Sequence, residues 1–68
     1  MHIHPVGTRA LLVELDDLSQ VMTWHEALTA QPLKDQVDAI AAATTLLLTF
    51  NTPNSAHAAA ELLEDSRP

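Results

Sequence analysis

The stretch V-D-A-I-A-A-A-T-T-L-L-L-T-F, residues 37–50, decides how this chain folds. Leu46, Leu48 and Phe50 would share one side of an extended segment over residues 45–50, because side chains alternate along a strand. Residues 37–42 predict a partner strand, with a turn at residues 42–44. A single helix over residues 37–48 is the alternative, since alanine and leucine are good helix formers. The threonines and Phe50 favour strands, so we predict the hairpin.

The first fifteen residues predict a second hairpin. The run A-L-L-V-E-L, residues 10–15, is almost wholly apolar and too short for a typical helix, which indicates a buried strand. Gly7 is the only glycine in the chain and predicts a turn, because glycine adopts positive φ without a steric penalty. Residues 1–6 would then form the outer strand, with Ile3 and Val6 packing against the core.

A helix is expected between the two hairpins. Asp17 can accept a hydrogen bond from the first turn, with Gln20 as its capping-box partner. Pro32 lacks an N–H and disfavours the helical conformation at the residue before it, so the helix should end near Ala30. The apolar stripe expected on this helix consists of Leu18, Val21, Met22, Ala27 and Leu28.

A second helix is expected after the turn at residues 51–54. Asn54 or Ser55 would cap it, and it would run from Ala56 to Glu64. Its apolar stripe would consist of Ala56, Ala59, Ala60 and Leu63. Residues 1–64 would therefore form one α+β domain, and residues 65–68 a polar tail or the start of a linker.

The order ββαββα predicts a small ferredoxin-like two-layer sandwich. Its four-stranded, mostly antiparallel sheet would carry both helices on one face. The strand–helix–hairpin arrangement places residues 45–50 in the middle of the sheet. No strand follows the last helix, so the N-terminal strand is expected to cover the edge that would otherwise stay open.

Composition narrows the classes of partner. The chain has 68 residues, no cysteine and a net charge of −6. Its basic residues are Arg9, Lys34 and Arg67, too few for a nucleic-acid or anionic-membrane surface. No apolar run approaches the roughly 20 residues of a membrane-spanning helix, and no signal peptide is visible, so we expect a cytoplasmic protein.

Two segments carry a resemblance to a known family. Residues 4–15, H-P-V-G-T-R-A-L-L-V-E-L, and residues 37–50 together resemble the N-terminal domain of KipI-like proteins. This family includes allophanate hydrolase subunit 1 and the corresponding subunit of 5-oxoprolinase. The chain departs from the pattern at Thr8, where the family usually has Asp, and at Ala41, where it usually has proline. Ala43 and Thr44 replace a common aromatic–arginine pair.

The resemblance implies a part in a larger assembly. The partner would be a second subunit similar to allophanate hydrolase subunit 2, or a C-terminal cyclophilin-like domain. Such an assembly would open an amide or lactam with ATP, while this domain itself would hold no cofactor. A KipI-like inhibitor that binds a sensor histidine kinase is the alternative. A free-standing protein that oligomerises through its sheet edges is a third possibility.

No residue is predicted to be catalytic or to bind a metal. His2 and His4 would point two imidazoles to one face of a strand, but a metal site needs further ligands. His25 and His57 would lie on helix surfaces without a matching spacing. Asp17 is explained as a helix cap, and the adjacent Asp16 would diverge from it.

Three residues are candidates for partner binding. Arg9 is the only lysine or arginine before Lys34 and could meet an acidic group. Trp24 is the only tryptophan, a residue type that often anchors interfaces. Thr44 occupies the position of the family's arginine and is included for that reason.

Overall fold

A computed structural model describes residues 1–65, and residues 66–68 of the expected tail lie outside that range. The elements follow the predicted order. They are β1 (His2–Val6), β2 (Ala10–Glu14), α1 (Leu18–Ala30), β3 (Gln36–Ala41), β4 (Thr45–Phe50) and α2 (Pro53–Asp65). The segment over residues 37–50 is thus the predicted hairpin and not one continuous helix.

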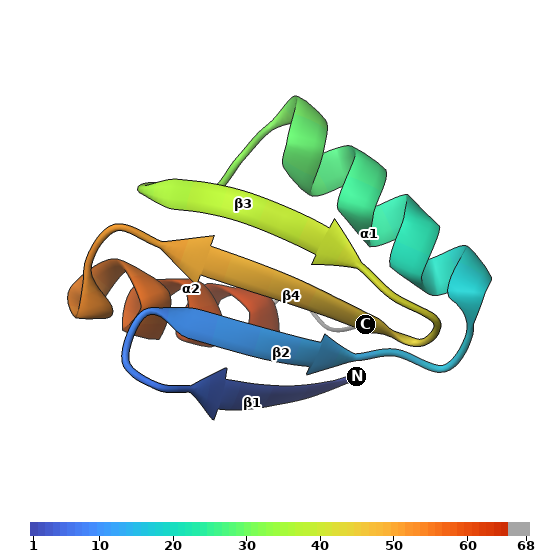
Figure 1. The fold of residues 1–68 in the computed structure, drawn as a ribbon, viewed down its shortest axis with the longest axis horizontal. Helices are drawn as coiled ribbons and strands as arrows, with labels where there is room; N and C mark the ends of the chain where they lie inside the picture. The colour runs from blue at the N-terminus through green and yellow to red at the C-terminus, as the bar shows by residue number, and fades with distance from the viewer. Residues whose placement is uncertain (66–68) are drawn as a thin grey trace.

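The four strands form one sheet in the order β1-β2-β4-β3, and every neighbouring pair is antiparallel (Figure 1). β4 lies between β2 and β3, as predicted, and α1 connects those two strands along the chain. β1 pairs along the outer edge of β2, in register from His2 opposite Glu14 to Val6 opposite Ala10. The prediction that the N-terminal strand covers this edge is therefore confirmed.

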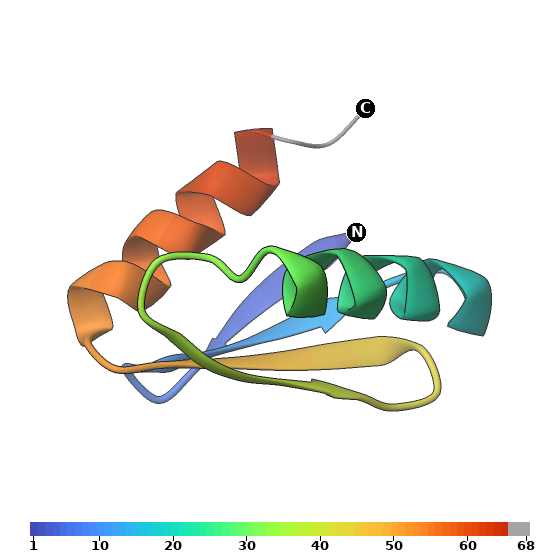
Figure 2. The same ribbon diagram turned by 90° about the horizontal axis from the view of Figure 1, so that it is seen from above.

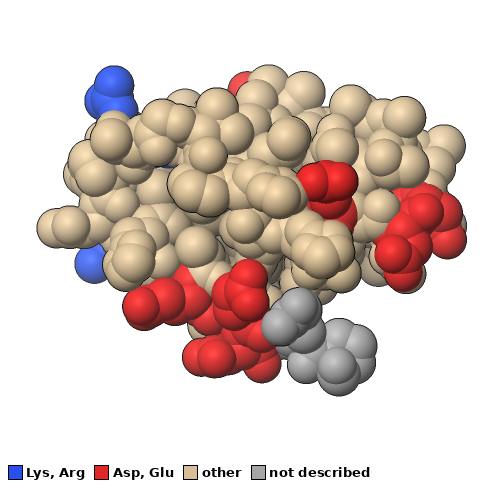
Figure 3. Space-filling view, turned by 90° about the horizontal axis from the view of Figure 1, so that it is seen from below, with Lys and Arg blue, Asp and Glu red and all other residues tan. Residues whose placement is uncertain are grey.

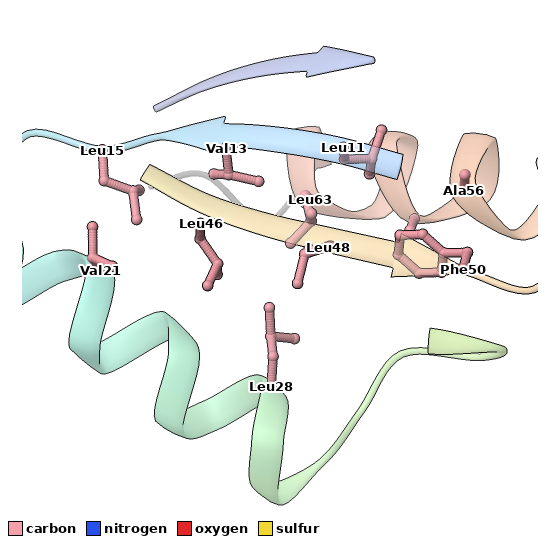
Figure 4. Packing of buried hydrophobic residues seen from close by; sticks show 11 residues of the cluster. Leu11, Val13, Leu15, Val21, Leu28, Leu46, Leu48, Phe50, Ala56 and Leu63 are labelled. Carbon is pink, nitrogen blue, oxygen red and sulfur yellow. The ribbon is translucent and has the colours of Figure 1, made fainter. Parts of the chain in front are cut away.

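Both helices lie on the same side of the sheet, which gives the predicted two layers (Figure 2). Leu46, Leu48 and Phe50 of β4 are all buried, as the alternation predicts. Figure 4 shows Leu46 and Leu48 pointing from β4 toward the helix layer, where they approach Leu28. The buried core consists of Leu11, Val13, Leu15, Val21, Leu28, Leu46, Leu48, Phe50, Ala56, Ala59 and Leu63.

The cap of α1 forms as predicted, with one shift. The Gln20 N–H donates to Asp17 Oδ1 at 2.9 Å, and this bond satisfies a free donor of the first turn. The Gln20 side-chain oxygen accepts from the N–H of Asp16 at 3.1 Å, one residue before the position of a regular capping box.

The predicted apolar stripe of α1 is only partly correct. Val21 and Leu28 are buried, whereas Leu18 and Met22 are 57% and 50% exposed and Ala27 is also exposed. Two buried residues seven positions apart define a narrow contact line along the helix. At about 100° per residue, Met22 is turned well away from that line.

Two half-buried side chains flank this contact line of α1. Trp24 packs against the core. His25 is the next residue and was predicted to lie on the helix surface. That prediction is wrong, because its Nε2 lies 3.0 Å from the carbonyl oxygen of Ala39 in β3.

Helix α2 begins at Pro53, three residues earlier than predicted. The cap is Thr52 and not Asn54 or Ser55, because Thr52 Oγ1 accepts from the N–H of Ser55 at 3.1 Å. Proline suits the first helical position, where its missing N–H would have no partner within the helix. The predicted buried face is otherwise correct, with Ala60 only half-buried.

Leu48→Ala should destabilise the protein strongly, because it removes a side chain that is 0% exposed at the centre of the core. We expect a loss of about 2–5 kcal/mol in the free energy of unfolding, measured by urea denaturation. The neighbouring Leu47→Ala is the matched control and should cost distinctly less, since Leu47 faces away from the helices. Equal losses at the two positions would contradict the alternation of β4.

Thr52→Ala should lower the free energy of unfolding by about 1 kcal/mol, because it removes the N-cap of α2. Asn54→Ala is the control, since the cap of α2 is formed by Thr52 and not by Asn54. Thermal denaturation of both variants checks the assignment, and a larger loss for Asn54→Ala would place the cap where the sequence first suggested.

Candidate functional site: hollows and the open face of the sheet

The three predicted partner-binding residues do not form one site. Arg9 lies in the turn between β1 and β2, and Thr44 in the turn between β3 and β4. The carbonyl oxygen of Arg9 accepts from the N–H of Phe50, and that of Thr44 accepts from the N–H of Leu15, each at 2.8 Å. Arg9 and Thr44 therefore lie at opposite ends of the sheet, and both residues are exposed.

Trp24 lines an open hollow with a volume of about 800 Å³. The hollow is lined by the first half of α1 and by Glu64 near the end of α2, and the end of α2 rises away from the sheet (Figure 2). Ser19, Asp16 and Glu64 also line it. An indole surface beside carboxylates suits an apolar or cationic side chain of a partner. Of the three candidates for partner binding, Trp24 is therefore the most favourably placed to contact a partner.

A second hollow, of about 350 Å³, lies between α2 and the β1–β2 hairpin. Its lining is mostly apolar and includes Ile3, Leu11 and Ala60. His57 also lines it, with its Nε2 3.3 Å from Glu61 Oε1 one turn further along α2. The small alanine side chains of α2 leave this space open, so sequence periodicity alone gave no sign of it.

The face of the sheet opposite the helices carries exposed apolar side chains. His4, Leu12, Leu47 and Ile40 stand in one row across the four strands. Ile40 is 50% exposed, and Val6 on the same face is 48% exposed. Val6 was expected in the core and is corrected here, because it shares the strand face of His4. We call this surface the open face.

The two N-terminal histidines lie on the open face as predicted, with their ring centroids 6.4 Å apart. The Nε2 of His4 contacts Glu14 Oε1 at 2.5 Å, across the β1–β2 pair. Within residues 1–65, no group of three or more His, Cys, Asp or Glu side chains is placed to hold a metal ion.

Along both edges of the sheet, some backbone groups cannot form hydrogen bonds with a further strand. On β3, the N–H of Ala39 donates to Asp38 Oδ1 at 2.9 Å, and the carbonyl oxygen of Ala39 is contacted by His25 Nε2. On the other edge, β1 contains Pro5, which has no N–H to donate. Both features reduce pairing through sheet edges, which weighs against oligomerisation by that route.

The hydroxyl groups of Thr52 and Ser55 hold the beginning of α2 in place. Ser55 Oγ donates to Asp35 Oδ2 at 2.6 Å, and Thr52 Oγ1 donates to Ser55 Oγ at 2.9 Å. Asp35 has a positive φ of 61°, which an aspartate tolerates better than most residues. This network ties the beginning of α2 to the loop before β3.

Charge is distributed unevenly over the surface. Glu61, Glu64 and Asp65 gather at the end of α2, and Figure 3 shows carboxylates along one side of the molecule. Figure 3 shows the two described basic side chains at the left of the view, the lower one close to a group of carboxylates. Neither helix of the part of the chain that the structure describes is long and apolar enough to cross a membrane.

Comparison with known families gives a match over residues 1–67, to the carboxyltransferase domain, subdomain C and D. The match covers both hairpins and both helices. The chain belongs to this family. It is the family of KipI-like proteins and of the related allophanate hydrolase and 5-oxoprolinase subunits, as the resemblance of the two quoted segments implied. A search of curated proteins found no match to the chain.

His25→Ala should lower the free energy of unfolding by about 1 kcal/mol in this carboxyltransferase C/D domain, since it leaves the half-buried Ala39 carbonyl without its side-chain donor. His57→Ala is the control, because the His57 side chain is 79% exposed and should change stability little. Urea denaturation at neutral pH compares the two. Indistinguishable midpoints would show that the His25 contact adds nothing to stability.

Proposed function

We propose that this chain is the N-terminal accessory domain of a protein similar to allophanate hydrolase subunit 1 and to its counterpart in 5-oxoprolinase. It would support assembly with a second subunit for ATP-dependent hydrolysis of an amide or lactam. The observation that carries the proposal is the family match over residues 1–67. The assignment to the allophanate hydrolase type within that family rests on the two resembling segments.

The chemistry of the described residues supports a binding role. The carboxylate of Asp17 caps α1, and the hydroxyls of Thr52 and Ser55 are committed to the start of α2. The hollow beside α2 is mostly apolar, and the Trp24 hollow combines an indole with polar and acidic side chains. Both kinds of surface suit contact with another protein. Catalytic groups and ATP would then belong to other parts of the assembly.

The separation of the candidate residues constrains the partner. Arg9 and Thr44 lie at opposite ends of the sheet, so a single partner that touches both must span the domain. A folded second subunit, or a cyclophilin-like domain of the same polypeptide, has that size. A short peptide would occupy one hollow alone, such as the hollow beside Trp24.

The proposal is tested by co-expressing the chain with a tagged protein similar to allophanate hydrolase subunit 2 from the same genome. We expect the two to purify together in a defined ratio, measured by intact mass. Retention instead by the dimerisation domain of a sensor histidine kinase would favour the KipI-like function. If the tagged protein retains none of the chain, the proposal is overturned.

Trp24→Ala should weaken co-purification with that partner by about tenfold or more if the Trp24 hollow is the contact, because buried tryptophans dominate interface energies. Met22→Ala on the same helix is the matched control, since its side chain is 50% exposed and lies outside the hollow. Circular dichroism of the free variants must show native helix content. Equal retention of both variants would move the contact away from α1.

A further inference from the structure

The hollow beside Trp24 combines an aromatic surface with polar groups. The Trp24 side chain is half-buried and packs against the core, and part of its surface still lines the hollow. Leu15, directly after β2, adds apolar surface, and Asp16, Ser19 and Glu64 add polar groups to the same lining. A flat aromatic ring beside carboxylates suits a side chain that is both planar and positively charged.

Two polar side chains of this lining are free to bind a further group. Gln20 and Thr23 are committed to the backbone, since Gln20 Oε1 accepts from the N–H of Asp16 and Thr23 Oγ1 donates to the carbonyl oxygen of Ser19. Glu64 also takes part in a contact. By contrast, the carboxylate of Asp16 and the hydroxyl of Ser19 form no hydrogen bond or ion pair within residues 1–65.

The end of α2 that borders the hollow carries negative charge where a helix favours positive charge. The last carbonyl groups of a helix form its negative end, which lysine or arginine stabilises. No basic residue lies in the last turn of α2, which contains Glu64 and Asp65, and Glu61 directly precedes it. A cation in the hollow would therefore relieve repulsion at this end of the helix.

The described part of the chain places no lysine or arginine in the hollow. Arg9 and Lys34 line other hollows, and Arg67 lies outside the described residues. On the α1 side, the positive end of the helix is offset by Asp17, whose carboxylate accepts from the first turn. The charge of Asp16 is thus additional, and the hollow attracts a cation from another molecule.

We propose that the hollow beside Trp24 binds an arginine side chain of the partner protein. The guanidinium lies against the indole, and its N–H groups donate to the Asp16 carboxylate and to the hydroxyl oxygen of Ser19. Arginine fits this hollow better than lysine, because a guanidinium is planar, donates in several directions and is less strongly hydrated. The inference rests on the proposed function only in naming the second subunit as that partner.

Titration of the 68-residue chain with N-acetyl-arginine amide tests the site directly. Trp24 is the only tryptophan, so its indole N–H gives a single NMR signal that reports on the hollow. We expect a saturable shift with a dissociation constant of about 10 mM, as one stacking contact and one exposed ion pair allow. N-acetyl-citrulline amide, which has the same shape without the charge, should bind about threefold more weakly or less. Equal binding of the two probes overturns the proposal, as does the lack of a saturable shift up to about 100 mM.

Two variants of matched charge locate the binding. Asp16→Asn should weaken binding of the arginine probe by about threefold, because it removes the charge and keeps the shape. Glu26→Gln changes the net charge equally and lies on α1 outside the hollow, so it should bind as the wild type does. Circular dichroism should show native spectra for both. Equal affinities of the two variants would place the binding outside the hollow and overturn the proposal.

Co-purification separates this inference from the proposed function. Asp16→Lys should weaken retention by the second subunit by about tenfold or more, since it sets like charges against each other, whereas Glu26→Lys should not. If the subunit retains the wild type and Asp16→Lys equally, the inference fails and the proposed function stands. If it does not retain the wild type, the proposed function fails, and the titration alone decides whether the hollow binds arginine.

Discussion

Burial of one side of β4 is the constraint on which the rest of the structure depends. Leu46, Leu48 and Phe50 are each less than 5% exposed, and the strand that carries them pairs on both sides. A strand in that position must have both neighbours and a covering layer. β2 and β3 supply the neighbours, and α1 and α2 supply the cover. The core of a 68-residue chain is small, and loss of this alternation would remove three of its eleven buried side chains from the centre.

The small size of the domain also explains why apolar side chains remain exposed on its surface. Each helix of a two-layer domain covers the sheet along a narrow line, so Leu18 and Met22 of α1 remain in contact with water. The helices also diverge, and the hollow beside Trp24 opens between them. On the other side of the sheet, Ile40 and its row stay uncovered. A domain of this size therefore leaves several apolar surfaces exposed, and these are the surfaces on which the proposed assembly would rely.

Much of the candidate binding surface could not be predicted from sequence patterns. Arg9, Trp24 and Thr44 were selected by residue type and by family position, and the structure places them apart. The open face depends on cross-strand register, which joins His4 to Ile40 although they are 36 residues apart in the chain. The hollow beside α2 depends on the small volume of its alanines. The contact of α1 with β3 arises because the helix lies along that strand, and no local signal shows this.

The sequence by itself determined the six elements and their order, because alternation, a single glycine, a proline and an aspartate cap act within a few residues of one another. It also determined which side of β4 would be buried. Only the tertiary structure decided that Ser55 at the start of α2 bonds to Asp35, that Val6 faces away from the core, and that Arg9 and Thr44 lie at opposite ends of the sheet. These depend on how segments distant in the chain pack together, and packing is fixed by volume and register rather than by local preference.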